Sequence, residues 1–519
     1  MALQNTVVEL ADGTIEGKRG RGLAKGTVSW KGIPFAAPAV GELRWRAPQP
    51  VTPWEGVLEC HDYGPVPIQD KLFTARGPNT FQPTSEDCLS LNVFAPEAVD
   101  DRPRPVMVFN YGGAYILGGT STPIYDGSFL ARARDVIVVT VNYRFGPFGF
   151  LDLSGYSTAE RTFDSNAGLK DMIAGLEWVQ RNIAAFGGDP DRVTVFGESA
   201  GGSAVLALLS TPAAEGLFAG AIAQSPAADL VVRKQTAELL ADEYVRLLMD
   251  PSRRAGAERT EPPLDPAQVA AVVDGASPSQ LLKAAHQLLK FTAKAGLSEP
   301  MPFAPVVDGQ YLPLPPVQAA MEGSTLPVPL ITGSNLDEGE LFARFWDLLP
   351  KPTHYLVGVH DPEIKAEIDR LYPGSKDQVR LSADAVFWVP TMIFAEHHGR
   401  RAPVYVYRYD YSPPLLKASG IGATHATELF AVFGMYRHPI GAPLAAAGNW
   451  QAAKQVTAAV QSRWTWFART GVPAEDWPRY SAENRKVLVI DKQPRVHDDP
   501  DGPRRAAWER VHLAFMESV

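Results

Sequence analysis

Hydrophobic and polar residues alternate with two different periods through the first half of the chain. Short runs rich in β-branched and aromatic residues predict strands at Leu89 to Ala95, Val106 to Asn110, Val136 to Asn142, Arg192 to Phe196 and Ala219 to Gln224. Apolar residues at helical spacing predict intervening helices at Leu169 to Phe186 and Gly202 to Leu208. Strands that alternate with helices in this way predict an α/β fold with a mostly parallel sheet and helices on both faces.

Helical patterns interrupt this alternation twice in the second half. Segments 234–249 and 264–294 predict a helical insertion at about 234–300, and helical material at 362–371 and 381–397 predicts another at about 340–400. Strands are expected at Val328 to Thr332 and Val404 to Tyr409, then a long helix at Trp450 to Thr470 and a final strand at Lys486 to Ile490. The sequence has no evident repeat or linker, so we expect a single domain over residues 1–519 with helical insertions above its sheet.

The N-terminal part of the chain has a different pattern of hydrophobic and polar residues. Residues 6–18 predict a hairpin around Asp12-Gly13, and Val28 to Phe35 predicts an edge strand. The stretch from Cys60 to Ser85 is rich in proline, glycine and polar residues and has no sustained period. A structureless loop of this length is uncommon unless it is functional, so we expect it to border the site.

The amino-acid composition of the chain limits the kinds of partner that we expect it to bind. The net charge is −9 and no dense run of Lys and Arg occurs, which argues against a nucleic-acid partner. No apolar run reaches the roughly 18 residues that a membrane span needs, and the N-terminus has neither the basic start nor the apolar core of a signal peptide. Only Cys60 and Cys88 occur, which is compatible with a reducing compartment. We expect a cytoplasmic protein with a small-molecule substrate and no membrane association.

The chemistry centres on Gly197-Glu198-Ser199-Ala200-Gly201, which lies between a predicted strand and a predicted helix. Such a turn strains the serine backbone and lifts its hydroxyl clear of the sheet, while the small glycines let neighbouring segments approach. The pentapeptide alone is a weak signal, and the flanking strand and helix strengthen it. Ser199 is therefore a candidate nucleophile.

A serine nucleophile needs a histidine base and an acid that orients it, and in this kind of fold both follow the serine in the order acid, histidine. Asp337 and Glu338 follow the predicted strand at 328–332, and either could orient the base. The same two carboxylates would also suit a helix N-terminus. Among ten histidines, only His425 has the right order and a suitable loop. No histidine spacing matches a metal motif, and we expect no metal or cofactor.

Backbone N–H groups must also stabilise the oxyanion that forms during acyl transfer. The run Tyr111-Gly112-Gly113-Ala114-Tyr115 directly follows a predicted strand, and its glycines allow close approach to a substrate oxygen. Gly113, Ala114 and Ala200 would together supply a cradle of three donors. An ordinary glycine turn is the alternative interpretation of this run.

These features resemble the type-B carboxylesterase and cholinesterase family of α/β-hydrolases, and most closely its bacterial para-nitrobenzyl esterases, from about Val7 to about Ile490. The resemblance implies an α/β-hydrolase fold, the triad Ser199, Glu338 and His425, and the oxyanion donors Gly113, Ala114 and Ala200. It therefore selects Glu338 over Asp337. The matching blocks are Gly32 to Ala36, Leu43 to Trp45, Glu86 to Leu89, Tyr111 to Tyr115, Asn142 to Gly146, Phe186 to Pro190 and Phe196 to Gly202.

The same resemblance implies roles for residues around the triad. Arg44 with Glu86 and Arg144 with Asp171 match buried ion pairs, which we assign to fold integrity. The positions that match neighbours of the triad are Glu198, Ser225 and Glu428, and those that match the substrate pocket are Leu341 and Phe342.

Two departures from the family pattern matter. The usual disulfide partner of Cys88 would follow Gly64-Pro65-Val66, where this chain has Pro67, so we expect free thiols. No residue between Gln69 and Pro83 matches the choline-binding tryptophan of the animal enzymes, which argues against a cholinesterase.

The function that this pattern favours is a serine carboxylesterase that hydrolyses small to medium carboxylic esters through an acyl-enzyme intermediate, as a monomer or weak homo-oligomer. Carbamate or amide hydrolysis by the same triad is an alternative, because the nucleophile and oxyanion donors would be shared. A non-catalytic cholinesterase-like binding module is a remote alternative, against which the intact triad argues.

Overall fold

The computed structural model describes residues 2–3, 5–99, 102–253, 256, 262–295, 301–345, 361–446 and 450–518. It comprises two compact units: Met1–Gly220 with Leu230–Pro315, and Ala221–Asp229 with Pro316–Val519. The prediction that residues 1–519 form a single domain stays a prediction.

The first unit is built on a mixed sheet whose central strands are buried along their whole length. β11 (Arg104–Asn110) pairs in parallel with β12 (Ile137–Val141) and with β13 (Gly188–Glu198). The pairs of β12 with β9 (Ser90–Pro96), of β9 with β5 (Thr27–Pro34) and of β5 with β4 (Lys18–Arg19) are antiparallel. Runs such as Ile137–Val141 are apolar on both faces, as expected of strands covered on both sides. In spatial order the strands are β4 (Lys18–Arg19), β5 (Thr27–Pro34), β9 (Ser90–Pro96), β12 (Ile137–Val141), β11 (Arg104–Asn110) and β13 (Gly188–Glu198).

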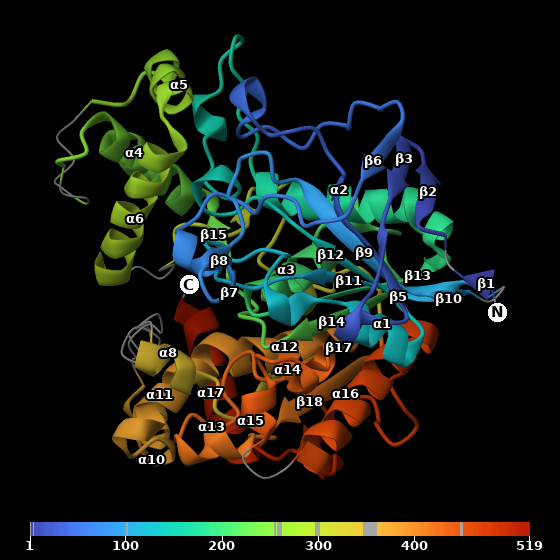
Figure 1. Cartoon of the computed structure of the whole chain (residues 1–519). Coiled ribbons are helices and arrows are strands. Elements are labelled where there is room, and N and C mark those ends of the chain that lie inside the picture. Colours follow the sequence, from blue (N-terminus) through green and yellow to red (C-terminus); the bar gives the residue numbers. More distant parts are fainter. Residues whose placement is uncertain are drawn as a thin grey trace. The chain divides into compact units, whose positions relative to one another are not determined.

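Helices and smaller sheets complete the first unit (Figure 1). The predicted hairpin is formed by β2 (Val7–Leu10) and β3 (Gly13–Glu16). The helices are α1 (Ser128–Arg134), α2 (Ala167–Asn182), α3 (Ala200–Leu209), α4 (Lys234–Met249), α5 (Pro266–Gly275) and α6 (Pro278–Ala295). The predicted helical segment 264–294 is thus two helices, because the residue before Pro278 is disfavoured in helical conformation.

The loop from Cys60 to Ser85 is more ordered than its composition indicates. It contains a 3-10 turn at Lys71–Thr74 and a small hairpin of β7 (Ala75–Gly77) and β8 (Thr80–Phe81). Cys60 and Cys88 are both free and buried, which confirms the expectation of free thiols. Burial raises the pKa of the Cys60 thiol to about 12, so it is protonated and unreactive at neutral pH.

The second unit has its own sheet. β14 (Gly220–Gln224), β17 (Leu330–Asn335), β18 (Val404–Tyr409) and β19 (Lys486–Ile490) pair in parallel in that order. β20 (Arg495–Asp498) then pairs antiparallel with β19. The prediction that Lys486 to Ile490 is the final strand is therefore wrong. β20 is mostly exposed and lacks the apolar run by which strands were recognised.

Helices make up most of the rest of the second unit (Figure 1). Its C-terminal helix α17, absent from the sequence-based prediction, packs against α10 through Ala507, Trp508 and Ile368. The helices are α7 (Pro316–Met321), α8 (Gly339–Phe345), α10 (Pro362–Leu371), α11 (Ser375–Ala383), α12 (Val389–His398), α13 (Pro414–Ala418), α14 (Leu429–Val432), α15 (Ala442–Ala446), α16 (Trp450–Thr470) and α17 (Gly502–Ser518).

One helical segment departs from α geometry. Between α11 and α12 the chain forms a π-helix at Asp384–Trp388. Asp384 is buried and accepts hydrogen bonds of 2.6 Å from the Tyr372 hydroxyl and the Arg504 guanidinium of α17. The wide turn is therefore tied to the C-terminal helix, and such turns occur frequently at functional sites.

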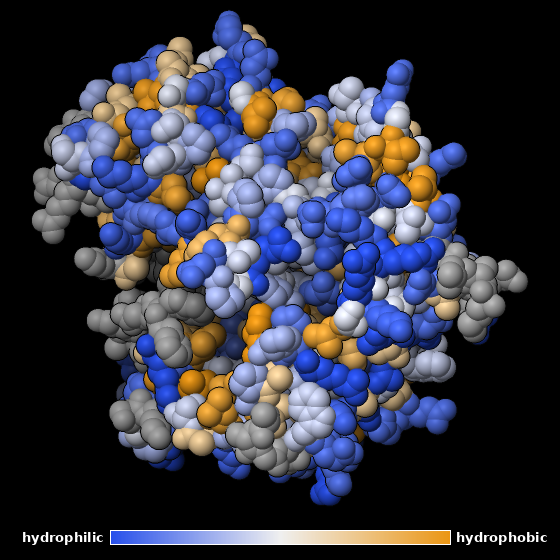
Figure 2. Space-filling model, in the orientation of Figure 1, coloured by the Kyte–Doolittle hydropathy of each residue, from blue (hydrophilic) through white to orange (hydrophobic). Residues whose placement is uncertain are grey.

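The surface of the described residues shows no extended apolar patch in the view of Figure 2, where hydrophobic residues are interspersed with hydrophilic ones. The most exposed large hydrophobic side chain in the described ranges is Leu72, at 73%. Among the described helices, none combines the length and the apolar character needed to cross a bilayer.

Both ion pairs expected from the family resemblance are present. Arg44 binds Glu86 through two contacts of 2.5 and 2.6 Å. Arg144 binds Asp171 through side-chain contacts of 2.8 and 2.7 Å, and its backbone N–H donates to the same carboxylate at 3.0 Å. The Arg144 and Asp171 side chains are 3% and 0% exposed, so each charge depends on the other for its compensation.

Replacing Arg144 by Met should destabilise the protein by about 3–5 kcal/mol, because Asp171 would be left as an uncompensated buried charge. Urea denaturation followed by circular dichroism measures the effect. The double variant Arg144→Met/Asp171→Leu should regain most of the loss, because it removes both charges together. A single variant within about 1 kcal/mol of wild type would contradict this account of the pair.

Candidate active site

Ser199 occupies a strained turn between β13 and α3. Its φ is 60° and its ψ −128°, a conformation that residues with a side chain rarely adopt. A Cβ on Gly197 would collide with the Gly201 backbone, and one on Gly201 would collide with the Asn110 carbonyl. Only glycine therefore fits at these two positions, and the structure contains the strand, tight turn and helix that the sequence predicts.

The oxyanion loop, which we define as Tyr111 to Tyr115, lies against this turn. Asn110 at the end of β11 is opposite Gly197 of β13 in the parallel register. A Cβ on Gly112 would lie 2.6 Å from the Glu198 carbonyl oxygen and 2.8 Å from the Ser199 Cβ. The loop backbone thus reaches Ser199 directly because no side chain intervenes.

Three backbone groups near Ser199 are the expected oxyanion donors. Gly113 and Ala114 have φ of 116° and 52°, and Ala200 is the first residue of α3. The first N–H groups of a helix have no partner within the helix and carry the positive end of its dipole. This combination favours an anion beside Ser199, which is what a tetrahedral intermediate would provide.

In the second unit, His425 and Glu338 form a buried pair. The His425 Nδ1 lies 2.6 Å from the Glu338 Oε2, and the two side chains are 5% and 4% exposed. With Nδ1–H donating to the carboxylate, the neutral ring has its lone pair on Nε2, the atom that a general base uses. The other Glu338 oxygen accepts a hydrogen bond of 2.6 Å from the Asn335 backbone N–H, which fixes the carboxylate.

Asp337 has a different set of contacts. Its Oδ2 accepts from the Ala423 N–H at 2.9 Å, and its own N–H donates to the Ala423 carbonyl at 3.0 Å. Asp337 therefore joins the loop that carries Glu338 to the loop that carries His425. The geometry thus separates the two carboxylates that local sequence left equivalent, because only Glu338 contacts the imidazole.

Further hydrogen bonds join the same two loops. The Asn335 Nδ2 donates to the Thr424 carbonyl at 2.8 Å, and the Leu341 N–H donates to the Thr424 hydroxyl at 2.9 Å. Leu341, expected to line the substrate pocket, thus contacts the histidine loop through its backbone. These contacts fix the segment that immediately precedes His425.

Two aromatic rings pack on the imidazole. The Phe342 and Phe387 centroids lie 4.8 and 4.7 Å from that of His425, and they stack on each other at 5.7 Å. Phe342 was expected near the site, whereas Phe387 was missed because it belongs to the π-helix, for which the sequence has no distinctive pattern. The Phe342 and Phe387 rings provide an apolar wall beside the His425 imidazole.

A second buried carboxylate, Glu428, lies next to Glu338 in this network. It accepts hydrogen bonds from the Asn335 Nδ2 at 2.6 Å and the Gln224 Nε2 at 3.2 Å. Burial, followed by the negative charge of Glu338, raises the pKa of Glu428 to about 7. Asn335, which the sequence analysis did not identify, therefore donates to both acids.

Ser225 and Glu198 are the other positions expected near the triad. Ser225 is wholly buried with φ of 43°, and its N–H donates to the Gly333 carbonyl at 2.8 Å. Its hydroxyl has no hydrogen-bond partner among the described residues. Glu198 is buried beside the oxyanion loop, where a Cβ on Gly112 would be 3.1 Å from its Oε2.

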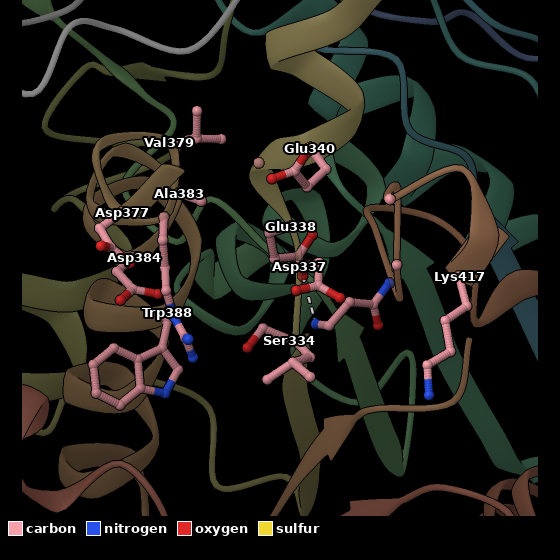
Figure 3. Close-up of a pocket in the computed structure, with 16 residues that line it drawn as sticks. Ser334, Asp337, Glu338, Glu340, Asp377, Val379, Ala383, Asp384, Trp388 and Lys417 are labelled. Atoms are coloured by element: carbon pink, nitrogen blue, oxygen red, sulfur yellow. Dashed lines mark hydrogen bonds between the residues drawn. The ribbon is translucent and has the colours of Figure 1, made fainter. Parts of the chain in front are cut away.

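A cavity of about 290 Å³ adjoins Glu338 within the second unit (Figure 3). Its lining includes Glu338, Asp337, Asp384, Trp388 and Lys417. Neither His425 nor the expected pocket residues Leu341 and Phe342 line it. Across the described ranges, no group of three or more His, Cys, Asp or Glu side chains is placed to hold a metal ion.

Comparison with known proteins gives a consistent picture. A model described as the carboxylesterase family matches residues 4–508. The para-nitrobenzyl esterase of Bacillus subtilis is 38% identical over 517 residues, covering 97% of this chain and 98% of that protein. The fumonisin B1 esterase of Sphingopyxis macrogoltabida is 34% identical over 506 residues, covering 93% and 85%.

Solved structures agree with these relatives. A PNB esterase structure superposes with a TM-score of 0.84 at 36% identity and covers 97% of this chain and 99% of that one. A carboxylesterase of Geobacillus stearothermophilus gives a TM-score of 0.80 at 33% identity, covering 97% and 100%. The predicted α/β-hydrolase fold is confirmed.

The raised pKa of Glu428 predicts a pH-dependent stability. In the unfolded chain this carboxyl has a pKa of 4.5, so folding strengthens its proton binding. Its contribution to stability is present below about pH 4.5 and is lost as the pH rises through about 7. Glu428→Gln removes this loss, so the free energy of unfolding should fall less between pH 5 and pH 8 than in wild type, by on the order of 3 kcal/mol.

Urea titrations at both pH values measure this difference. Glu42→Gln, at an exposed position, is the control and should keep the wild-type pH dependence. Parallel pH curves for Glu428→Gln and wild type would show that Glu428 does not titrate in this range.

Proposed function

The chain belongs to the carboxylesterase family and is a carboxylic ester hydrolase of the serine type, and we propose that Ser199, Glu338 and His425 perform its reaction. The observation that carries this assignment is the 2.6 Å contact between His425 and Glu338, which leaves Nε2 as the basic atom. The strained turn at Ser199 supports the other half of the triad.

The reaction begins when the Ser199 hydroxyl attacks the ester carbonyl carbon and His425 takes the hydroxyl proton. Glu338 holds the ring in the productive tautomer and stabilises the imidazolium that forms. His425 then gives the proton to the leaving alcohol as the ester C–O bond breaks. Water, activated by the same histidine, attacks the resulting acyl-enzyme and releases the acid.

Negative charge develops on the carbonyl oxygen in both tetrahedral intermediates. We assign its stabilisation to the N–H groups of Gly113, Ala114 and Ala200. The approach of the Gly112 backbone to Ser199 and the helix start at Ala200 support this role. Because the donors belong to the backbone, they need no reorganisation during the reaction.

The substrates that suit this site are small to medium, largely apolar esters. Phe342 and Phe387 beside His425 support an apolar wall, to which a charged acyl or alcohol group would be a poor match. Glu198, Ser225 and Glu428 complete the proposed environment of the triad.

We further place the enzyme in the cytoplasm of a bacterium, as a monomer or weak homo-oligomer that needs no cofactor. The two free, buried cysteines support a reducing compartment. The scattered exposed apolar residues of the described surface support weak self-association at most.

Ser199 should be the residue that acylating and phosphonylating reagents modify. Treatment with an organophosphate followed by peptide mass spectrometry should find the adduct on Ser199, and Ser199→Ala should lower kcat for para-nitrophenyl acetate by roughly 10⁶-fold. The control is His397→Ala, outside the proposed triad, which should keep activity and labelling. An adduct elsewhere, or full activity of Ser199→Ala, would disprove the mechanism.

The two neighbouring carboxylates should respond differently to the same substitution. Glu338→Gln removes the negative charge that orients His425 and stabilises its imidazolium, and should lower kcat by roughly 10⁴-fold. Asp337→Asn keeps an oxygen acceptor for the Ala423 N–H and should lower kcat by less than about tenfold. Steady-state kinetics on the two variants side by side provides the measurement, and equal losses would contradict the assignment of the acid.

A further inference from the structure

The oxyanion loop is fixed at both ends to one short segment, Tyr143 to Gly146. At its start, the Tyr143 hydroxyl donates to the Tyr111 carbonyl at 2.7 Å. At its end, the Gly146 N–H donates to the Tyr115 carbonyl at 2.6 Å. The residues between these anchors include Gly113 and Ala114, whose N–H groups are the proposed oxyanion donors.

The tyrosine contact is reciprocal. The Tyr111 hydroxyl donates to the Tyr143 carbonyl at 3.3 Å, and the two rings stack with centroids 4.5 Å apart and planes 20° apart. Both side chains are 0% exposed. Burial raises the pKa of the Tyr143 phenol well above its ordinary value, so it remains a proton donor throughout the working pH range.

The loop needs such anchors because its backbone is strained. Ala114 and Tyr115 have φ of 52° and 56°, so two consecutive residues with side chains lie in the left-handed region. Each such conformation is unfavourable and persists only where surrounding contacts enforce it. The peptide that the Tyr143 hydroxyl binds is the one that leads directly into Gly112, where the loop meets Ser199.

Core packing is the simpler explanation for a buried tyrosine, and it would account for the ring of Tyr143. It would not account for the hydroxyl, because a phenylalanine would fill the same space. Tyr115 provides the comparison within the same loop: it is equally buried, but its hydroxyl has no hydrogen-bond partner among the described residues. The Tyr143 hydroxyl therefore makes a hydrogen bond, whereas the Tyr115 hydroxyl makes none among the described residues.

We propose that Tyr143 is a positioning residue of the oxyanion hole, holding the Tyr111 peptide so that the Gly113 and Ala114 N–H groups point at the developing oxyanion. This inference rests on the proposed function, since it requires those N–H groups to be the donors. Tyr143 acts through the loop backbone and contacts no reacting atom.

The test is Tyr143→Phe, which removes one oxygen and keeps the ring. For para-nitrophenyl acetate, kcat should fall by roughly 3- to 10-fold, the effect of one hydrogen bond, while KM stays within about twofold of wild type. The Ki of an aryl trifluoromethyl ketone, which forms a tetrahedral adduct with the serine, should rise by the same factor as kcat falls.

Tyr411→Phe is the control, because it removes the same atom from a buried ring outside the proposed site, where the hydroxyl has no hydrogen-bond partner among the described residues. It should leave kcat, KM and the Ki of the ketone at wild-type values. Thermal denaturation of both variants establishes that they are folded.

The possible outcomes distinguish a wrong positioning role for Tyr143 from a wrong proposed function. If Tyr143→Phe lowers only the melting temperature, or if Tyr411→Phe lowers kcat equally, the positioning role is wrong. If the wild-type enzyme gives no adduct on Ser199, the proposed function itself fails. A wild type that is labelled on Ser199, together with a fully active Tyr143→Phe, overturns this inference alone.

Discussion

The close approach of β11 and β13 at their carboxyl ends is the constraint on which the turn at Ser199 depends. Asn110 is opposite Gly197, and there is no room for a side chain at Gly112, Gly197 or Gly201. Parallel strands deliver the loops that follow them to the same edge of the sheet. Glycine at these positions converts that shared edge into contact between the oxyanion loop and Ser199, and the strained φ of Ser199 is the geometric consequence.

The acid–histidine pair depends on a different constraint, the burial of two carboxylates in one network. Two adjacent negative charges in a low-dielectric environment repel each other, so both need donors. Asn335 supplies them, with its backbone N–H on Glu338 and its side-chain amide on Glu428. The pKa of Glu428, raised first by burial and then by the charge of Glu338, shows that this compensation is incomplete.

Sequence patterns located most elements and the candidate triad, because these depend on periodicity, chain order and glycine spacing. They left Asp337 and Glu338 equivalent until a family resemblance was applied, because both follow β17 and only three-dimensional contacts distinguish them. Asn335, Phe387 and Tyr143 carried no local signal, because their roles arise from contacts with residues far apart in the chain. β20 and α17 were missed because β20 is largely exposed and α17 has a weak amphipathic pattern.

The buried pair of Arg144 and Asp171 has a further structural role besides fold integrity. Arg144 lies between Tyr143 and Gly146, the two residues that anchor the oxyanion loop, and both its backbone N–H and its guanidinium bind Asp171 of α2. A hydrophobic replacement of the pair can preserve stability, but it cannot supply the directional contact that fixes the backbone of this segment. Conformational precision is therefore a reason to keep an ion pair whose net contribution to stability is small, and here that precision would be transmitted to the proposed oxyanion donors through the Tyr143 hydroxyl and the Gly146 N–H.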